Sequence, residues 1–172
     1  DTPKCGLFLD MGLGKTAITL TAINELKYDR FEVDKVLIIA PLRVAEDTWS
    51  TEAGKWDHLK HLRISKILGS QRERRRALAA TADIYVVNRE NVVWLTNELS
   101  SIGDCWFFDM VVIDELSSFK SAKSQRFKAL RKYITRSNRV VGLTGTPAPN
   151  GLIDLWSQIY LLDQGKRLGT TI

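Results

Sequence analysis

Five short runs of apolar residues recur along the chain, and most are rich in valine and isoleucine. Each run is nearly continuous, without the polar alternation of a strand that has one face in water. Such runs are typical of strands in a parallel sheet that are buried on both faces. The pattern predicts strands at residues 7–9, 36–40, 84–87, 110–113 and 140–143.

Between these runs, apolar residues recur three and four positions apart, which is the spacing of a helix with one buried face. Because strand and helix alternate, we expect an α/β fold with a mainly parallel sheet of five or more strands and helices on both faces. In such sheets, ligands bind at the carboxyl ends of the strands. The expected helices span residues 15–26, 44–56, 71–80, 91–99, 124–134 and 151–162.

The composition indicates one soluble domain, with 172 residues, 44% of them apolar and 26% charged. No apolar run approaches the ~20 residues that span a bilayer, and we find no secretory leader, so we expect a cytoplasmic protein without a membrane partner. Cys5 and Cys105 lie far apart in the sequence and are expected to be reduced thiols. His58 and His61 are too few to form a zinc site.

Positive charge is concentrated in two stretches of the chain, within a formal net charge of +5. Residues 120–139 contain eight Lys or Arg and no acidic residue, and residues 60–76 contain seven Lys or Arg and one Glu. A local excess of this kind favours polyanionic partners such as nucleic acid. The alternative is that these stretches are only the solvated faces of helices.

The first predicted strand leads into the sequence DMGLGKT, which resembles a phosphate-binding loop. Glycines let backbone N–H groups approach a phosphate, and the helix that follows adds its positive N-terminal dipole. Lys15 would reach the β- and γ-phosphates, and Thr16 would hold Mg²⁺. The strict pattern has glycine where this chain has Leu9. The predicted nucleotide-binding residues are Met11, Gly12, Leu13, Gly14, Lys15 and Thr16.

Two adjacent acidic residues, Asp114 and Glu115, follow the fourth predicted strand. A nucleotide site needs a carboxylate that holds Mg²⁺, partly through water, and Asp114 suits this role. Glu115 suits the orientation or deprotonation of the attacking water. An apolar run that ends in two acids is common on its own, and it gains its meaning from the phosphate loop about a hundred residues earlier.

Polar residues also follow the fifth and second predicted strands. Thr144 and Thr146 suit the sensing of a γ-phosphate or of its carboxylate partner. Asn150 is expected mainly as the N-cap of the last helix. After the second strand, Pro41 places Arg43 near the start of a helix, where backbone N–H groups suit an anion such as a nucleic acid phosphate. An ordinary turn is an equal alternative there.

Four segments, DMGLGKT, APLRVAEDTW, VVIDELSSFK and GLTGTPAPNGLIDLW, together resemble motifs I, Ia, II and III of superfamily 2 helicases. The resemblance is greatest to the sucrose non-fermenting branch, which includes chromatin remodellers and their bacterial and phage relatives. VVNREN at residues 86–91 resembles the segment called Ib. In this branch, the position of Leu9 is normally not glycine.

This resemblance implies a translocase on double-stranded DNA, built from two RecA-like lobes with ATP and Mg²⁺ between them. The chain resembles the first lobe, with Gly12 to Thr16 on ATP and Asp114 and Glu115 serving Mg²⁺ and water activation. A bacterial or phage member would be associated with the nucleoid. Hydrolysis would be coupled to movement through Thr144, Gly145 and Thr146. The DNA backbone would be contacted, without sequence preference, by Pro41, Leu42, Arg43, Asn88 and Arg89.

Three differences from the complete family pattern shape the expectation for this chain. Where the second motif usually has histidine, Ser117 cannot take a proton, which leaves its link to the third motif open. The adenine-reading segment would precede residue 1, and the second lobe with its arginine finger would follow Ile172. We therefore expect residues 1–172 to be a single lobe that alone binds ATP weakly and hydrolyses little.

Two other functions remain as alternatives to a DNA-dependent ATPase. One is a phosphate-loop NTPase that is not a translocase, although the chain has no guanine-reading N-K-x-D pattern. The other is a catalytically impaired relative that serves as a nucleic-acid-binding scaffold. The presence of Lys15, Thr16, Asp114 and Glu115 argues against catalytic decay.

Overall fold

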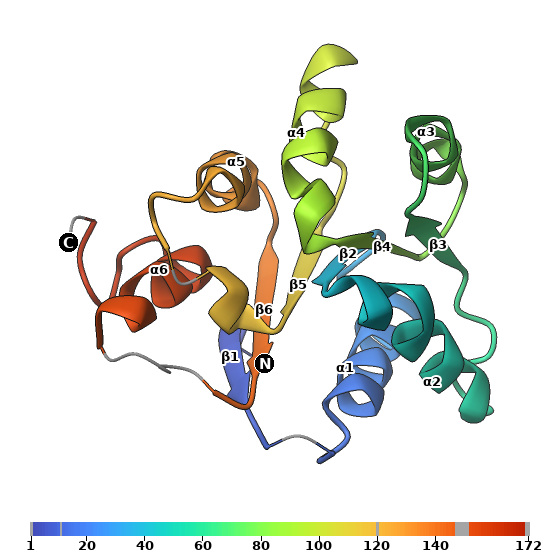
Figure 1. The fold of residues 1–172 in the computed structure, drawn as a ribbon. Helices are drawn as coiled ribbons and strands as arrows, with labels where there is room; N and C mark the ends of the chain where they lie inside the picture. Colours follow the sequence, from blue (N-terminus) through green and yellow to red (C-terminus); the bar gives the residue numbers. More distant parts are fainter. Residues whose placement is uncertain (1, 11, 120, 147–151, 171–172) are drawn as a thin grey trace.

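The computed structural model describes residues 2–10, 12–119, 121–146 and 152–170, and the side chains of residues 152 and 153 are not described. These residues form one sheet of six parallel strands in the order β1-β6-β5-β2-β4-β3 (Figure 1). The strands are β1 (Lys4–Phe8), β2 (Val36–Ala40), β3 (Ile64–Ile67), β4 (Ile84–Asn88), β5 (Met110–Asp114) and β6 (Arg139–Thr144).

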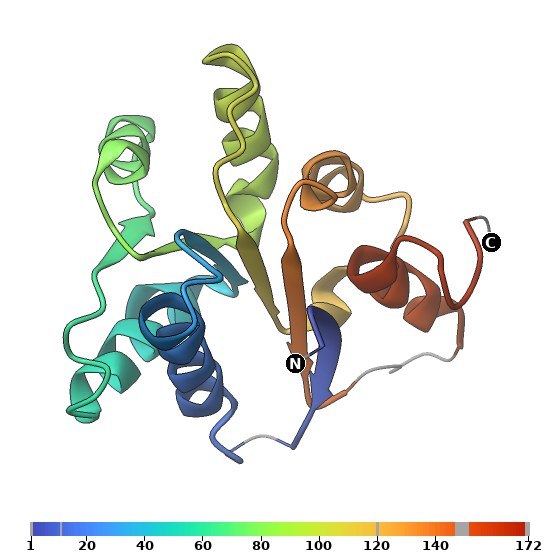
Figure 2. The same cartoon turned by 180° about the vertical axis from the view of Figure 1, so that it is seen from behind.

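Helices cover both faces of the sheet, as the two opposite views show (Figures 1 and 2). One face is packed by α1 (Lys15–Asn24) and α2 (Trp49–Lys55), and the other by α3 (Gln71–Ala79), α4 (Val92–Ser101), α5 (Gln125–Ile134) and α6 (Leu152–Asp163). Short π-helical and 3₁₀ turns lie beside them: η1 (Glu25–Asp29), η2 (Val44–Thr48), η3 (Arg89–Asn91) and η4 (Leu116–Phe119).

The central strand β2 shows why its sequence is continuously apolar. All five of its residues are buried. Leu37 and Ile39 point into the core beneath α4 and α5, whereas Val36, Ile38 and Ala40 point into the core beneath α1 and α2. Because successive side chains of a strand alternate between its faces, a strand between two helical layers needs apolar residues at every position.

The predicted α/β class and the parallel sheet are confirmed. Four predicted strands match β2, β4, β5 and β6 closely, and the first is shifted from residues 7–9 to Lys4–Phe8. The prediction missed β3, a strand of four residues at the sheet edge that includes the exposed Lys66. The helix predicted at residues 44–56 begins as the π-helical turn η2. No described helix has the length and apolar character needed to cross a membrane.

Candidate nucleotide site

The loop after β1 turns through two glycines that precede α1. Gly12 has φ 84° and Gly14 has φ 74°, a left-handed conformation that residues with a side chain rarely adopt. A Cβ atom at either position would have no described atom within 4 Å, so the loop backbone is open to a ligand. Leu13 is exposed between them, and Met11 lies outside the described residues.

Lys15 is the first residue of α1, and its side chain folds back over the loop. Its Nζ donates to the carbonyl of Leu9 at 2.6 Å and to the carbonyl of Asp10 at 3.2 Å. The ammonium group thus lies above the open backbone of the glycine turn, where it can exchange neutral carbonyls for phosphate oxygens. Beside it is a cavity of about 310 Å³, lined by Gly12, Gly14, Lys15, Thr16, Ala17 and Glu52.

The cavity residue Glu52, on α2, was not among the predicted site residues. Its carboxylate accepts hydrogen bonds from Trp56 Nε1 at 3.0 Å and from Lys55 Nζ at 3.2 Å. These two donors, Trp56 first, lower the pKa of Glu52. No motif marks this position in the sequence, because it reaches the loop only through the packing of α2 beside α1.

Asp114 ends β5 and accepts a hydrogen bond from a tryptophan of α2, in the helical layer formed by α1 and α2. Its Oδ2 accepts a hydrogen bond from Trp49 Nε1 at 3.1 Å, and Trp49 is fully buried. Burial raises the pKa of Asp114, and the charge of Glu115 adds to this, whereas the Trp49 hydrogen bond and the charge of Lys15 act in the opposite direction. A buried carboxylate of this kind is stabilised in its charged form by a nearby cation.

Asp114 and the glycine loop with Thr16 have the chemistry that a bound Mg²⁺ ion needs. Mg²⁺ is held by one or two carboxylates together with substrate phosphates and water, and does not need a cage of protein ligands. The described residues contain no cluster of three or more His, Cys, Asp or Glu side chains that could form such a cage. Asp114 offers one partly buried carboxylate. The positive charge of Lys15 in the loop acts to lower the pKa of this carboxyl group.

Glu115 is the junction between the ends of β5 and β6. Its Oε1 accepts hydrogen bonds from Ser117 Oγ at 2.8 Å and from Thr144 Oγ1 at 2.9 Å. Thr144 Oγ1 in turn accepts from the backbone N–H of Thr146 at 3.1 Å. The second and third motifs are thus linked by hydrogen bonds through Glu115, and Ser117 contacts the same carboxylate oxygen as Thr144. Gly145 lies between the two threonines, and the predicted cap Asn150 lies outside the described residues.

The segment predicted to face a nucleic acid phosphate begins the helical stretch before α2. The carbonyl of Pro41 accepts a hydrogen bond from Ala45 N at 2.9 Å, so a helical turn starts here. Leu42 and Arg43 are exposed, and Arg43 forms no ion pair with any described residue. The geometry is that of an accessible helix start with a cation beside it.

Asn88, also predicted to contact DNA, is only 6% exposed. Its Nδ2 donates to Glu90 Oε2 at 3.0 Å, and its Oδ1 accepts from Asn91 Nδ2 at 2.6 Å. The side chain of Asn88 therefore shapes the turn after β4. Arg89 is partly exposed and forms an ion pair with Glu90 at 3.1 Å, so Arg89 is more accessible than Asn88.

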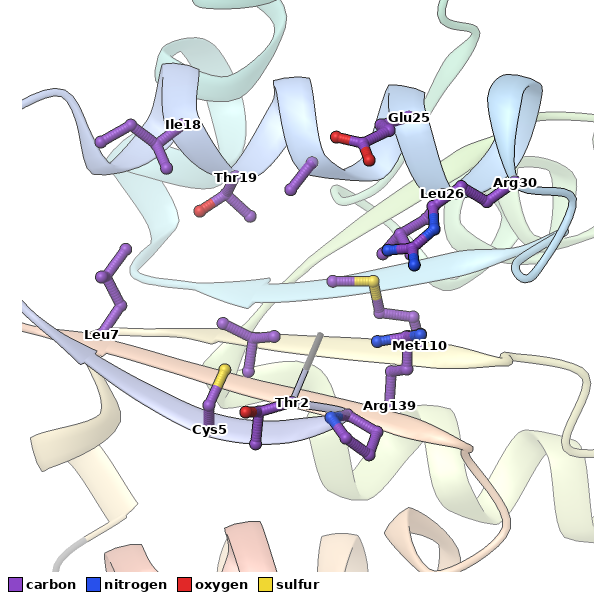
Figure 3. A pocket seen from close by; sticks show the side chains of 13 residues that line it. Thr2, Cys5, Leu7, Ile18, Thr19, Glu25, Leu26, Arg30, Met110 and Arg139 are labelled. Atoms are coloured by element: carbon purple, nitrogen blue, oxygen red, sulfur yellow. The ribbon is translucent and has the colours of Figure 1, made fainter.

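A separate cavity of about 370 Å³ lies between α1 and the strands β1 and β6 (Figure 3). Cys5 and Leu7 from β1 lie across from Ile18 and Thr19 of α1 and from Leu26 of η1. The lining includes none of the predicted site residues, so this cavity is not the nucleotide site.

The SNF2-related domain matches residues 2–167. The chain belongs to this family. Among relatives, putative protein p41 of Acyrthosiphon pisum secondary endosymbiont phage 1 is 45% identical over 99% of the chain and 38% of its own length. The DNA excision repair protein ERCC-6-like of Mus musculus is 34% identical over 99% of the chain and 14% of its own length. The SNF2-related chain thus spans well under half of each of these relatives.

Two solved structures share this SNF2-related fold. The Sulfolobus solfataricus SWI2/SNF2 ATPase core in complex with dsDNA matches with a TM-score of 0.77 and 28% identity, covering 94% of the chain and 32% of that protein. The UvsW helicase of bacteriophage T4 matches with a TM-score of 0.62 and 18% identity, over 91% of the chain and 52% of that protein, and supports the fold alone. The predicted resemblance to a first RecA-like lobe of the SNF2 type is confirmed.

Proposed function

We propose that this SNF2-related lobe binds ATP with Mg²⁺ and, within the full-length protein, drives movement on double-stranded DNA by hydrolysing it. The observation that carries the proposal is that three motifs meet at the carboxyl end of the sheet: the glycine loop after β1, the acidic pair at the end of β5 and Thr144 at the end of β6. The similarity to an SWI2/SNF2 ATPase core bound to dsDNA supports the same function.

In this proposal, the loop residues Gly12 to Thr16 bind the phosphates of ATP. The left-handed glycines turn backbone N–H groups toward the ligand, and Lys15 moves from the carbonyls of Leu9 and Asp10 to the phosphate oxygens. Thr16 and Asp114 would hold Mg²⁺. When bound, Mg²⁺ neutralises negative charge on the phosphates during transfer.

Glu115 is proposed as the group that accepts the proton of the attacking water. As the water oxygen bonds to the γ-phosphorus, the bond from that phosphorus to the bridging oxygen breaks and its electron pair leaves with ADP. The water proton passes to the Glu115 carboxylate. Thr144 contacts the same carboxylate, so it would sense this change and pass it to Gly145 and Thr146 in the coupling segment.

DNA would be contacted at its phosphates and therefore without sequence preference. Pro41, Leu42 and Arg43 provide a helix start and a cation, and Arg89 lies beside the buried Asn88 in the turn after β4. A second lobe, supplied elsewhere in the full-length protein, would close over ATP from the other side.

Each of the two basic stretches contains both ion-paired cations and cations without an ion pair to a described residue. On α5, Lys128, Arg131 and Lys132 are exposed and form no ion pair with a described residue. A positive field that favours polyanions can extend from both stretches, since Lys66, Arg72 and Arg76 are also exposed without an ion pair to a described residue. Between residues 60 and 76, three cations are paired with carboxylates: Lys60 with Asp57, Arg63 with Asp83, and Arg75 with Glu98.

The test is the ATPase rate of the full-length protein with and without double-stranded DNA. We expect DNA to stimulate turnover and both Lys15→Ala and Glu115→Gln to abolish it. Removal of Mg²⁺ by a chelator should have the same effect. Wild-type turnover in Glu115→Gln would refute the proposed base, and turnover that ignores DNA would favour a different phosphate-loop NTPase. Absence of turnover together with intact DNA binding would favour the scaffold alternative.

A further inference from the structure

The two hydrogen bonds to Glu115 converge on a single carboxylate oxygen. Ser117 Oγ and Thr144 Oγ1 both donate to Oε1, at 2.8 and 2.9 Å. They come from different elements, since Ser117 belongs to η4 and Thr144 ends β6. Among the described residues, no hydrogen bond is formed to the other oxygen, Oε2. One oxygen is thus restrained from two sides, and the other is left to a ligand or water.

The backbone explains why the residue at position 117 can reach Glu115 at all. Glu115 has φ 60°, in the left-handed region, and its carbonyl accepts a hydrogen bond from Ser118 N at 3.0 Å. The chain therefore reverses immediately after β5 and brings Ser117 back beside the Glu115 side chain. Leu116 is fully buried next to Gly142, where an added Cβ would lie 2.5 Å from Leu116 Cδ2, so this turn is pressed against β6.

We propose that Ser117 is a positioning residue that, together with Thr144, fixes the orientation of the Glu115 carboxylate for ATP hydrolysis. The inference rests on the proposed function of Glu115 as proton acceptor. A glutamate side chain has several rotatable bonds, and a single hydrogen bond would leave the carboxylate free to turn about that contact. Two donors on one oxygen remove this freedom, so Oε2 is kept available for the water proton before the substrate arrives.

This role predicts a specific kinetic signature. Loss of the Ser117 hydroxyl changes the geometry of proton acceptance but leaves the glycine loop and Lys15 in place. Turnover should therefore fall while nucleotide affinity is retained. Ser118 provides a matched control, because its hydroxyl is buried in the same turn and has no hydrogen-bond partner among the described residues. Loss of that hydroxyl should leave turnover unchanged.

The experiment compares Ser117→Ala, Ser117→Thr and Ser118→Ala in the full-length protein, with saturating double-stranded DNA and Mg²⁺. We expect Ser117→Ala to lower kcat about tenfold, the loss typical of one hydrogen bond to a charged group. The dissociation constant of a fluorescent ATP analogue should not change, and Ser117→Thr should restore kcat. Urea unfolding of each variant establishes that it is folded, and Ser117→Cys, a weak donor of similar size, replaces the alanine variant if that one is unfolded.

Two outcomes would overturn the positioning role. One is wild-type kcat in Ser117→Ala, or in Ser117→Cys where that variant is used, while Glu115→Gln is inactive. The other is an equal loss of kcat in Ser118→Ala, which would mean that the turn merely tolerates no change. Failure of the proposed function is recognised separately, because Glu115→Gln would then retain turnover whatever the Ser117 variants do.

Discussion

Gly142 lies in β6 without a side chain because Leu116 fills the space beside it. The contact matters for the site, since Leu116 stands between Glu115 and Ser117 in the turn that brings them together. A packing constraint inside the core thus extends to the residue proposed to accept a proton. The same principle applies to Trp49, which is buried as a core residue and also donates a hydrogen bond to Asp114.

Gly142→Ala should destabilise the protein by about 1–3 kcal/mol, because the new Cβ overpacks a fully buried contact. Urea unfolding measures the change in the free energy of unfolding. The control is Gly54→Ala in α2, where an added Cβ meets nothing within 4 Å. Because position 54 is exposed, alanine there should stabilise the protein by about 0.5–1 kcal/mol. Equal unfolding free energies for Gly142→Ala and wild type would contradict the packing argument.

At the residue scale, the sequence predicted where candidate side chains lie when their place in the chain alone decides it. Lys15, Asp114 and Glu115 lie at or just after the carboxyl ends of parallel strands, and these ends share one edge of the sheet. The Ser117 and Trp49 hydrogen bonds could not be predicted in this way. The first depends on a left-handed backbone at Glu115, which no glycine marks, and the second joins residues that are distant in sequence.

The element that the sequence did not predict, β3, is attached to the rest of the sheet by a buried carboxylate. Asp83 has no exposed surface and lies just before β4. Its Oδ2 accepts from Arg63 N at 2.8 Å, just before β3, and its Oδ1 pairs with Arg63 at 3.2 Å and with Lys27 of η1 at 3.4 Å. Four residues with one exposed lysine give a weak strand pattern, and this anchoring is visible only in three dimensions.

Asp83→Asn should destabilise the protein at neutral pH by about 2–4 kcal/mol, because it removes a buried charge from its two cationic partners. Burial alone would raise the pKa of Asp83, but the hydrogen bonds from Arg63 and the charges of Lys27 and Arg63 outweigh it, so this pKa is lowered. A lowered pKa stabilises the fold above the ordinary value of 3.8, and this stabilisation is lost as pH falls below it.

The measurement is urea unfolding of wild type and Asp83→Asn at several pH values from neutral to acid. The difference in unfolding free energy should shrink as pH falls below 3.8, the ordinary value. Asp57→Asn is the control, since Asp57 is paired with Lys60 at the surface and its side chain is 95% exposed. Such a pair contributes about 0–1 kcal/mol. A difference for Asp83→Asn that does not vary with pH would contradict the ionic origin of its effect.

At the scale of the whole molecule, exposed cations without an ion pair to a described residue lie on α5, within residues 60–76 and at Arg43. The sequence shows two basic stretches as local excesses, but it could not tell which of their cations are paired, because partners such as Asp83 and Glu98 are distant in sequence from Arg63 and Arg75. Arg43 is one of the cations left exposed without an ion pair among the described residues, at the helix start after β2.

Arg43→Ala should weaken DNA binding by the full-length protein to a similar degree for unrelated sequences, because a phosphate contact carries no base information. The slope of log affinity against log salt should fall by about one. Fluorescence anisotropy over a salt series measures both. Lys60→Ala, in the turn before β3, removes the same charge from a surface ion pair and should leave the slope unchanged. An effect confined to one DNA sequence would contradict a phosphate contact.

The pairing of β1 with β6 has a consequence for synthesis on the ribosome. Residues Lys4 to Phe8 lie beside Val140 to Thr144, so β1 leaves the ribosome long before the strand that becomes its neighbour. Contacts between such distant segments close slowly, whereas the inner strands β2, β4 and β5 can pair earlier. The carboxyl ends of β1 and β5 are therefore joined through β6 only late in synthesis, so the proposed nucleotide site forms after nearly all of these strands have been made.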